Sequence, residues 1–499
     1  MALDRDGLLR TYRWSSNDPK DRFSVENPAT GEIIAWIQGG GAAQVDAAVK
    51  AANEAYETDW RHRSPTERGA LLLKCADVLE ANADEIARIE TMENGKPFTQ
   101  ARSFDVAALI MLFRYFGGIV DKIPGDHIDH GAITTSVVLE PFGVVGAIIP
   151  FNWPPIHTAG KLAPALAVGN TVVLKPGEQT PLTPAYIVEL LQSVLPENVV
   201  NIVPGAGSIA GAALASHPLV RKVTFTGSTK AGAAVLHSAA DNITPALLEL
   251  GGKNAYIVFD DADLDRAVRD GLEGGYFNQG EACTAASRML VQRGIYDRFV
   301  ERLSEGVRKL KVGDGMRPDT HVGPLVTEVH RKRVQSYIDL GVKDGLVIAA
   351  EAALPDDPAL AGGFYVKPTL FADVPGDHVL FNEEIFGPVV TITPFDTEEE
   401  AVRLCNQSEY GLVCGIYTRD MEKGLRVARH VDVGITLFNT YNRGGVGMPF
   451  GGAKHTGFGR EHCLDTLKEF GRLKTIRHPS GLGKLTNWFA VDEIYGPRD

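Results

Sequence analysis

Cysteine is scarce in this sequence of 499 residues, and the five cysteines are widely spaced with no C-x-x-C pair. A disulfide framework and a structural zinc site are therefore not expected, and reduced thiols indicate a cytoplasmic protein. The amino terminus has no apolar run of signal-peptide length, and no stretch approaches the ~20 apolar residues that span a bilayer. We expect no metal ion, no leader and no membrane span.

Positive charge is also in deficit, because 50 Lys and Arg stand against 63 Asp and Glu, giving a formal net charge of -13. No cluster of basic residues overrides that average, so nucleic acid and anionic membranes are not expected partners. The hydrophobic content of 44% is ordinary for a globular enzyme, and the chain is long enough for two or three domains. We expect a small-molecule partner.

Short β-branched runs alternate with helix-length segments in two series, which predicts α/β domains with parallel, doubly wound sheets. Ser64-Pro65-Thr66-Glu67 predicts a capped helix start, and Cys75 falls on the apolar face of that helix, so it is expected in the core. Helical spacing also marks residues 43–56 and 296–310. The expected strands are 135–139, 144–149, 171–174, 199–203 and 222–226, then 255–259, 289–291, 389–392 and 434–438.

Three residues far apart in the chain suffice together for covalent oxidation of an aldehyde. The thiolate of Cys283 can add to a carbonyl, the carboxamide of Asn152 can hold the oxyanion, and Glu249 can activate water on a thioester. Taken singly, each has an ordinary structural interpretation: an inert buried cysteine, a turn residue and a carboxylate at a strand end.

The glycine-rich segment 205–211 superficially resembles a dinucleotide fingerprint, but its spacing is wrong by one residue. Two other strand ends are better placed. Glu178 could hydrogen-bond both ribose hydroxyls with help from Lys175, and Ser228 can cap a helix whose amino terminus attracts phosphate. A solvated pair of charges at a strand end remains the alternative for Lys175 and Glu178.

Seven motifs in order and spacing resemble the NAD(P)-dependent aldehyde dehydrogenase superfamily, from about residue 25 to residue 478: PFNWP, LKPGEQTP, FTGS, LELGGKN, FNQGEACTAASR, NEEIFGPV and PFGGAKHTGFGRE. The resemblance implies an NAD-binding domain of Rossmann type (1–122 and 142–250), an α/β catalytic domain (251–471) and a small β oligomerisation unit (123–141 and 472–485). Residues 486–499 form a carboxyl-terminal tail. A homodimer or homotetramer is implied.

The resemblance also implies roles for individual residues. Cys283 is the nucleophile, the Asn152 side chain and the Cys283 backbone N–H form the oxyanion hole, Glu249 is the general base and Glu461 relays protons. NAD is expected in preference to NADP, because a 2′-phosphate would meet the Glu178 carboxylate. The implied cofactor-binding residues are Ile149, Phe151, Lys175, Glu178, Gly207, Gly211, Phe225, Ser228, Leu250, Glu384 and Phe386.

The implied substrate funnel has glycine at Gly160 and Gly444, where relatives often carry Trp or Phe. A wide mouth and a preference for bulky, aromatic or long-chain aldehydes follow, unless neighbouring segments fill the space. The polar contacts in this funnel are expected to be His157, Tyr441 and Arg443.

One position departs from the family pattern. Glu281 stands where many members have Gln, and it is expected to raise the pKa of the thiol or to alter the mobility of the loop. The intact Glu249-Leu250-Gly251-Gly252 segment argues against a CoA-acylating enzyme. Two other classes of function stay open at this point: a catalytically idle protein on the same scaffold, and a cysteine hydrolase without nucleotide.

Overall fold

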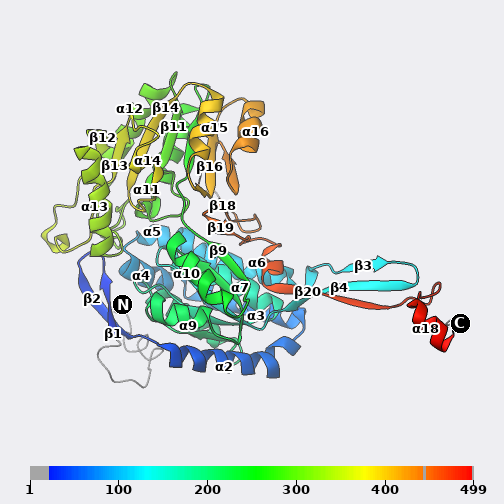
Figure 1. The fold of residues 1–499 in the computed structure, drawn as a ribbon. Coiled ribbons are helices and arrows are strands. Elements are labelled where there is room, and N and C mark those ends of the chain that lie inside the picture. The colour runs from blue at the N-terminus through cyan, green and yellow to red at the C-terminus, as the bar shows by residue number, and fades with distance from the viewer. Residues whose placement is uncertain (1–21, 442–444, 497–499) are drawn as a thin grey trace.

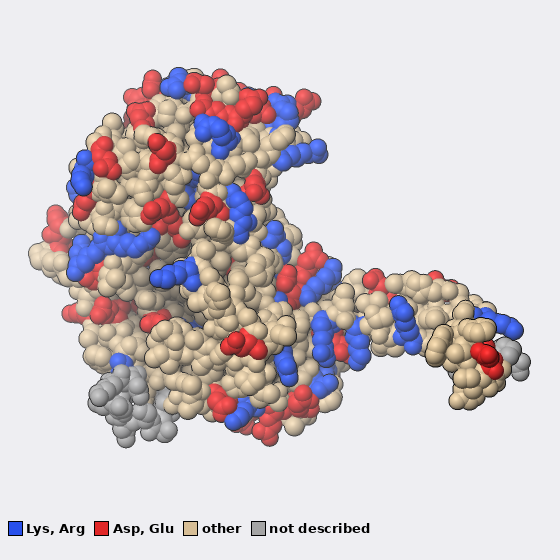
Figure 2. Space-filling model, in the orientation of Figure 1, with Lys and Arg blue, Asp and Glu red and all other residues tan. Residues whose placement is uncertain are grey.

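Two sheets and an arm organise the computed structural model, which describes residues 22–441 and 445–496. Each sheet lies in its own α/β body, and the slender arm extends away from both bodies with the carboxyl-terminal helix at its tip (Figure 1). Acidic and basic side chains are interspersed over the face that is drawn in Figure 2. The fold is therefore the expected α/β architecture with an additional small β unit.

The first sheet has the strand order β19-β9-β8-β5-β6-β7. Its core strands are parallel, and β19 pairs with β9 in the antiparallel sense. Strand order reverses on either side of β5, which confirms the doubly wound prediction and creates a switch point where α/β sheets bind ligands. These strands are β5 (Val144–Ile148), β6 (Thr171–Lys175), β7 (Val200–Ile202), β8 (Val220–Thr226), β9 (Ala246–Glu249) and β19 (Gly457–Phe458).

Helices cover both faces of this sheet because its strands are apolar on both sides. Val145 and Val172 pack into one core cluster with helices that include α3 (Pro65–Ala81) and α7 (Pro154–Val168). Val144 and Val173 pack on the other face with α2 (Ala42–Thr58) and α10 (Thr229–Ala240).

Helix α3 begins as the sequence predicts. Ser64 Oγ accepts from the Glu67 amide at 3.3 Å, and the Ser64 amide donates to Glu67 Oε2 at 2.7 Å. This reciprocal capping box confirms the predicted start, and Cys75 is buried in the core as expected.

The second sheet has the order β12-β13-β14-β11-β10-β16-β17, and it is parallel except for the antiparallel edge pair β12 and β13. Four of its strands match predicted runs, whereas β12, β13 and β16 were not predicted. The strands are β10 (Ala255–Val258), β11 (Arg288–Gln292), β12 (Val347–Glu351), β13 (Thr369–Ala372), β14 (Val389–Phe395), β16 (Val413–Tyr417) and β17 (Ile435–Phe438).

The arm is an antiparallel sheet of β3 (Asp126–Asp129), β4 (Ile133–Pro141) and β20 (Gly471–Pro479). The placement of residues 135–139 among the parallel strands is therefore wrong. Those residues pair with β20, which returns from the far end of the chain (Figure 1). Local sequence pattern cannot reveal such a distant partner.

One continuous helical stretch among the described residues, Phe98–Lys122, is long and apolar enough to cross a membrane by length and composition, with a mean hydropathy of 1.6. The sequence expectation that no stretch approaches this length is therefore wrong. Half of that window is buried, and Leu109, Phe113 and Phe116 lie in the core cluster between α3 and α7. The apolar side chains on the inner face of this helix are what packing against two helices requires.

The remaining elements connect these layers. The predicted helices 43–56 and 296–310 correspond to α2 and α12. The other elements are β1 (Arg22–Asn27), β2 (Glu32–Gln38), α4 (Ala83–Asn94), α5 (Phe98–Gln100), η3 (Ala101–Asp105), α6 (Val106–Ile119), α8 (Leu182–Gln192), α9 (Ala212–Ala215), α11 (Leu264–Tyr276), α12 (Tyr296–Arg308), α13 (Glu328–Lys343), α14 (Val379–Asn382), α15 (Glu398–Asn406), β15 (Tyr410–Gly411), α16 (Met421–His430), β18 (Ala453–Lys454), α17 (Thr466–Glu469) and α18 (Phe489–Tyr495).

Candidate active site

Cys283 follows a tight left-handed turn at the end of α11. Asn278, Gln279 and Gly280 have φ angles of 51°, 56° and 70°. A Cβ at Gly280 would collide with the Gly387 carbonyl, so only glycine fits there. Strain concentrated in one turn is typical of a functional loop, and here the turn presents a half-buried thiol.

Asn152 ties this loop to the start of α7. Its Nδ2 donates to the Glu281 carbonyl at 3.0 Å, and its own carbonyl accepts from Asn278 Nδ2 at 3.1 Å. On its other side, Asn152 Oδ1 lies 3.3 Å from His157 Nε2. Because Oδ1 only accepts, His157 Nε2 carries the proton in this contact. Burial holds the pKa of His157 well below its usual range, so the ring is neutral.

Glu249 ends β9 with an unusual lack of partners. It is buried, and neither carboxyl oxygen has a hydrogen-bond partner among the described residues. Burial and then the charge of Glu461 raise the pKa of Glu249, while Lys161 and Arg460 oppose that shift. A buried carboxyl with a raised pKa and free oxygens is suited to accept a proton from water.

Glu461 sits in the same charged group but is paired. Its Oε1 accepts from Lys161 Nζ at 2.8 Å, and Lys161 also donates to Thr224 Oγ1 at 3.1 Å. The two carboxyls thus have different environments, one ion-paired and one without a cation partner. Two carboxyl groups in such different environments can take different roles in proton transfer.

The Cys283 thiol shares this electrostatic environment. Burial raises its pKa first, and the carboxyls of Glu249 and Glu384 raise it further. The thiol therefore keeps its proton near neutral pH and needs a base to become a nucleophile.

Several of the residues predicted to bind the nucleotide lie at the carboxyl ends of β5, β6 and β8. Glu178 is exposed there, and its Oε1 accepts from the Gly207 amide at 2.7 Å. The Lys175 ammonium group is buried beside it, and Ser228 caps α10 as predicted. Predicted residues Ile149, Gly211, Phe225 and Leu250 belong to the same edge of the sheet or its adjoining turns.

Glu384 and Phe386 lie on the opposite side, in the second body. Glu384 Oε1 accepts from the Gly252 amide at 2.8 Å. Phe386 adopts a φ of 62°, and its ring lies 5.9 Å from that of Phe151. A dinucleotide fits this arrangement, because a carboxylate for a ribose, a capped helix terminus and an orphaned buried Thr226 hydroxyl face one strand edge.

Lys96 is a buried residue that sequence reasoning missed. Its Nζ donates to the Asn152 carbonyl at 2.8 Å and lies 4.4 Å from the centre of the Trp153 ring. It also pairs with Glu90 at 2.8 Å and with Asp105. The ammonium group therefore holds the backbone of Asn152. The available signal was Asp105, an acidic residue directly before the apolar run of residues 106–113.

The prediction that the substrate funnel is open beside Gly160 is wrong. A Cβ at Gly160 would lie 2.9 Å from His462 Nε2, so the imidazole fills the space that the glycine leaves. The prediction that Tyr441 contacts substrate is also wrong, because its ring is in the core and its hydroxyl donates to the Thr284 carbonyl at 2.9 Å. Arg443 and Gly444 lie outside the described residues.

The structure does not support the prediction that Glu281 adds a negative charge near the Cys283 thiol. It is buried, its Oε1 accepts from the Val326 amide at 3.1 Å, and burial raises its pKa to about 8. At neutral pH it is a protonated acid.

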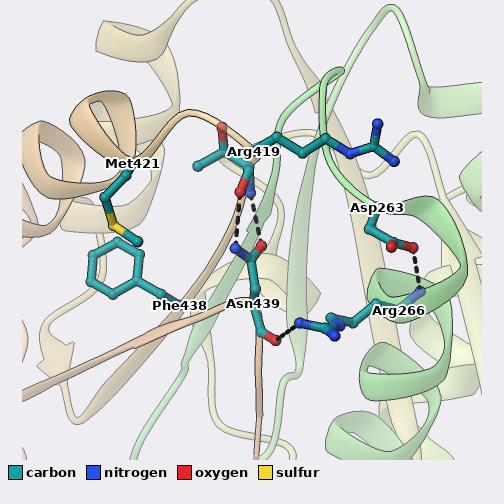
Figure 3. Close-up of a pocket in the computed structure, with 7 residues that line it drawn as sticks. Asp263, Arg266, Arg419, Met421, Phe438 and Asn439 are labelled. Carbon is teal, nitrogen blue, oxygen red and sulfur yellow. Dashed lines mark hydrogen bonds between the residues drawn. The ribbon is translucent and has the colours of Figure 1, made fainter.

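A separate cavity of about 270 Å³ lies at the carboxyl ends of β10, β16 and β17 (Figure 3). Its polar groups bond one another: Asn439 pairs with both backbone groups of Thr418, and Asp263 accepts from the Arg266 amide. It contains none of the predicted site residues.

Comparisons with known proteins agree on one family. The sequence model of the aldehyde dehydrogenase family matches residues 14–476. The chain is 51% identical over 483 residues to aldehyde dehydrogenase citD of Monascus ruber, covering 97% of this chain and 96% of that protein. It is 50% identical over 481 residues to an aldehyde dehydrogenase of Didymella fabae, covering 96% and 97%.

Solved structures of related proteins are similar to this chain over nearly its whole length. PnpE from Pseudomonas sp. WBC-3, in complex with nicotinamide adenine dinucleotide, superposes with a TM-score of 0.91 at 40% identity, covering 94% of this chain and 96% of that chain. Betaine aldehyde dehydrogenase from Staphylococcus aureus, in complex with NAD+, gives 0.92 at 36% identity, covering 98% and 99%.

Proposed function

The chain belongs to the aldehyde dehydrogenase family, and we propose that it oxidises a bulky or aromatic aldehyde to a carboxylic acid through a thioester on Cys283. It is an NAD-dependent enzyme of that family. The observation that carries the catalytic proposal is the convergence of Asn152 on the Cys283 loop, beside a buried Glu249 without hydrogen-bond partners.

In the first step the Cys283 sulfur, after losing its proton to a base, bonds to the carbonyl carbon of the aldehyde. The oxygen takes the electron pair of the C=O bond. One N–H of the Asn152 carboxamide is used by the Glu281 carbonyl, which leaves the second N–H for the oxyanion, together with the Cys283 backbone N–H. NAD, when bound, supplies the acceptor for the hydride that leaves the thiohemiacetal carbon.

In the second step Glu249 takes a proton from water, which attacks the thioester carbon and breaks the C–S bond. The carboxylic acid leaves and the thiolate is regenerated. Glu461, held by Lys161 at 2.8 Å, supports Glu249 as the next member of a proton relay.

Replacing Cys283 with Ala tests the nucleophile. The variant is expected to bind NAD with unchanged affinity while aldehyde-dependent NADH formation falls to background, because covalent addition precedes oxidation. Cys75→Ala is the matched control, since that thiol lies on α3 and is buried in the core. Appreciable turnover by Cys283→Ala would overturn the assignment. A nucleotide-independent esterase activity as the main activity would favour a cysteine hydrolase.

The aromatic side chains beside the nucleophile loop support a bulky or aromatic substrate. The Trp153 ring stacks on Phe277 at 5.8 Å, and Phe104 contacts these two rings at 5.5 and 5.3 Å. Trp153 adjoins Asn152 and Phe277 begins the turn that leads to Cys283. A higher kcat/KM for benzaldehyde or a long aliphatic aldehyde than for acetaldehyde is expected, because more apolar area is buried in the transition state. The opposite ranking would refute the substrate class.

A homodimer or homotetramer is supported by the arm, whose strand β20 is exposed along almost its whole length. We place the NAD-binding, catalytic and oligomerisation units at the boundaries that the sequence implies. The five free cysteines are consistent with a reducing compartment, and we propose a cytoplasmic location.

A further inference from the structure

His462 is a polar side chain in the site that the proposed mechanism leaves unused. Its Nε2 is buried without a hydrogen-bond partner among the described residues. The ring packs on Phe450 with centroids 5.3 Å apart, and the His462 carbonyl accepts from the Gly447 amide at 2.7 Å. The backbone adopts a φ of 65°, which is uncommon outside glycine and is a sign of functional constraint.

The imidazole lies next to the proposed catalytic groups. Its Nε2 is 3.9 Å from Glu461 Oε2, too long for a hydrogen bond. A Cβ at Gly160 would touch it at 2.9 Å, and a Cβ at Gly451, the residue after Phe450, would lie 2.7 Å from Glu249 Oε1. His462 therefore contributes to the wall that carries Glu249 and Glu461, in the space above Gly160.

The neighbouring polar groups are already engaged. His157 Nε2 faces Asn152 at 3.3 Å, and Glu461 Oε1 is held by Lys161. Burial lowers the pKa of His462, with Glu461 opposing and Lys161 reinforcing the shift, so the ring is neutral and offers one N–H donor and one acceptor. A buried polar atom left without a partner is costly, and a ligand that satisfies it gains affinity.

We propose that His462 determines substrate specificity by hydrogen-bonding a hydroxyl group on an aromatic aldehyde. The proposal rests on the proposed function, and it narrows the substrate class from aromatic aldehydes to hydroxylated ones. The aromatic rings near the nucleophile loop supply the apolar contacts, and His462 supplies the polar contact that distinguishes substrates. A site built to bond a hydroxyl discriminates strongly against the analogue that lacks it.

The test compares kcat/KM for benzaldehyde with that for 2-, 3- and 4-hydroxybenzaldehyde. The wild type is expected to favour at least one hydroxy isomer by about tenfold or more, and His462→Leu to reduce that ratio by about tenfold, mainly through KM. His462→Gln, which can still donate and accept, should keep part of the preference. His430→Gln, on exposed α16, is the matched control and should keep all of it.

A second set of variants tests the contact itself. Gly160→Ala places a methyl group where it must displace the imidazole, so it should lower the hydroxyl preference as His462→Leu does. In a His462→Ala background, Gly160→Ala should have little further effect on the ratio. Thermal unfolding of each variant shows that the ratios are measured on folded protein.

The proposal is overturned if the wild type prefers no hydroxy isomer, if His462→Leu leaves the ratio unchanged, or if the Gly160 and His462 changes act additively. Failure of the proposed function itself would appear differently, as the absence of NADH formation from every aldehyde in wild type and variants alike.

Discussion

Glu249 and Glu461 show how two residues of one type acquire different chemistry from their surroundings. Glu461 is paired with Lys161, whereas among the described residues Glu249 has no cation within hydrogen-bond distance, and its pKa is raised. The folded protein therefore holds a proton on Glu249 at pH values where an ordinary glutamate has lost it.

This state of Glu249 predicts the pH dependence of turnover. Because only the ionised carboxyl can accept a proton from water, kcat of the wild type should rise with pH at values above those at which an ordinary glutamate ionises, as Glu249 deprotonates. Glu249→Gln should have a much lower kcat with no such rise. Steady-state kcat across that range checks it, and an equally steep rise in the variant would assign the titration to another group.

Glu281 predicts a dependence of stability on pH. The groups that face it are Gln279, the Val326 amide, His330 at 3.5 Å and, at longer range, Lys96. Its folded pKa of about 8 exceeds that of a free glutamate, so its contribution to stability is present at low pH and is lost as pH rises toward 8.

Glu281→Gln removes this titration. The variant should gain stability relative to wild type between about pH 6 and about pH 9, while keeping turnover near neutral pH. Denaturant unfolding at the two pH values is the measurement. A stability difference that does not change with pH would mean that Glu281 is already ionised in the folded protein.

Glu178 predicts the choice of cofactor. NAD should be favoured over NADP because a 2′-phosphate would approach an exposed carboxylate that already holds the Gly207 amide. Glu178→Gln should narrow the ratio of kcat/KM for the two cofactors by lowering repulsion. Equal use of both by the wild type would contradict this reading.

At the scale of elements, the site depends on loops held by buried charges. Lys96 follows α4 and joins Glu90 on that helix, Asp105 in η3 and the Asn152 carbonyl before α7. Removing the ammonium group would release the Asn152 backbone and leave two buried carboxyls without a cation.

Lys96→Met should therefore lose about 3–5 kcal/mol of stability and lower kcat about 100-fold, with the affinity for NAD retained. The triple variant Lys96→Met, Glu90→Gln, Asp105→Asn is the control. It should regain stability but not kcat, since the bond to Asn152 is still missing. Full recovery of kcat in the triple variant would show that Lys96 acts only on stability.

Which elements could be predicted from sequence follows from the range of the interactions that form them. The start of α3 depends on hydrogen bonds between Ser64 and Glu67. These residues are three positions apart, so the sequence shows the motif directly. The membership of β4 depends on β20, more than 300 residues away, and strand propensity does not specify a partner. β12, β13 and β16 were also missed.

The site itself divides in the same way. Motif resemblance named Cys283, Asn152 and Glu249, and their catalytic roles stay predictions. The filling of the Gly160 space by His462 and the protonated state of Glu281 depend on packing between distant segments. No local pattern encodes either, so both were misread from sequence.

At the scale of the whole molecule, the arm exposes more apolar surface than a monomeric protein usually leaves in contact with water. Leu473 and Ile476 on β20 are 71% and 46% exposed, and Trp488 and Phe489 at its tip are both 77% exposed. A strand edge with apolar side chains is a surface for pairing with another chain.

The double variant Leu473→Asp, Ile476→Asp should therefore dissociate the oligomer into smaller species, because association would bury two unpaired carboxylates in the interface. Light scattering after size-exclusion chromatography gives the masses. Val329→Asp on α13, where the side chain is 80% exposed, is the matched control and should keep the wild-type mass. A monomeric wild type would refute the proposal.

The central claim is a covalent thioester on Cys283 that Glu249 helps to hydrolyse, and a single turnover of Glu249→Gln with NAD and benzaldehyde tests it most directly. After acid quenching, intact and peptide mass spectrometry should find one benzoyl group on Cys283, with about one NADH formed for each acylated site. NADH formation with an unmodified Cys283, or acylation at another residue while Cys283 stays free, would contradict the account.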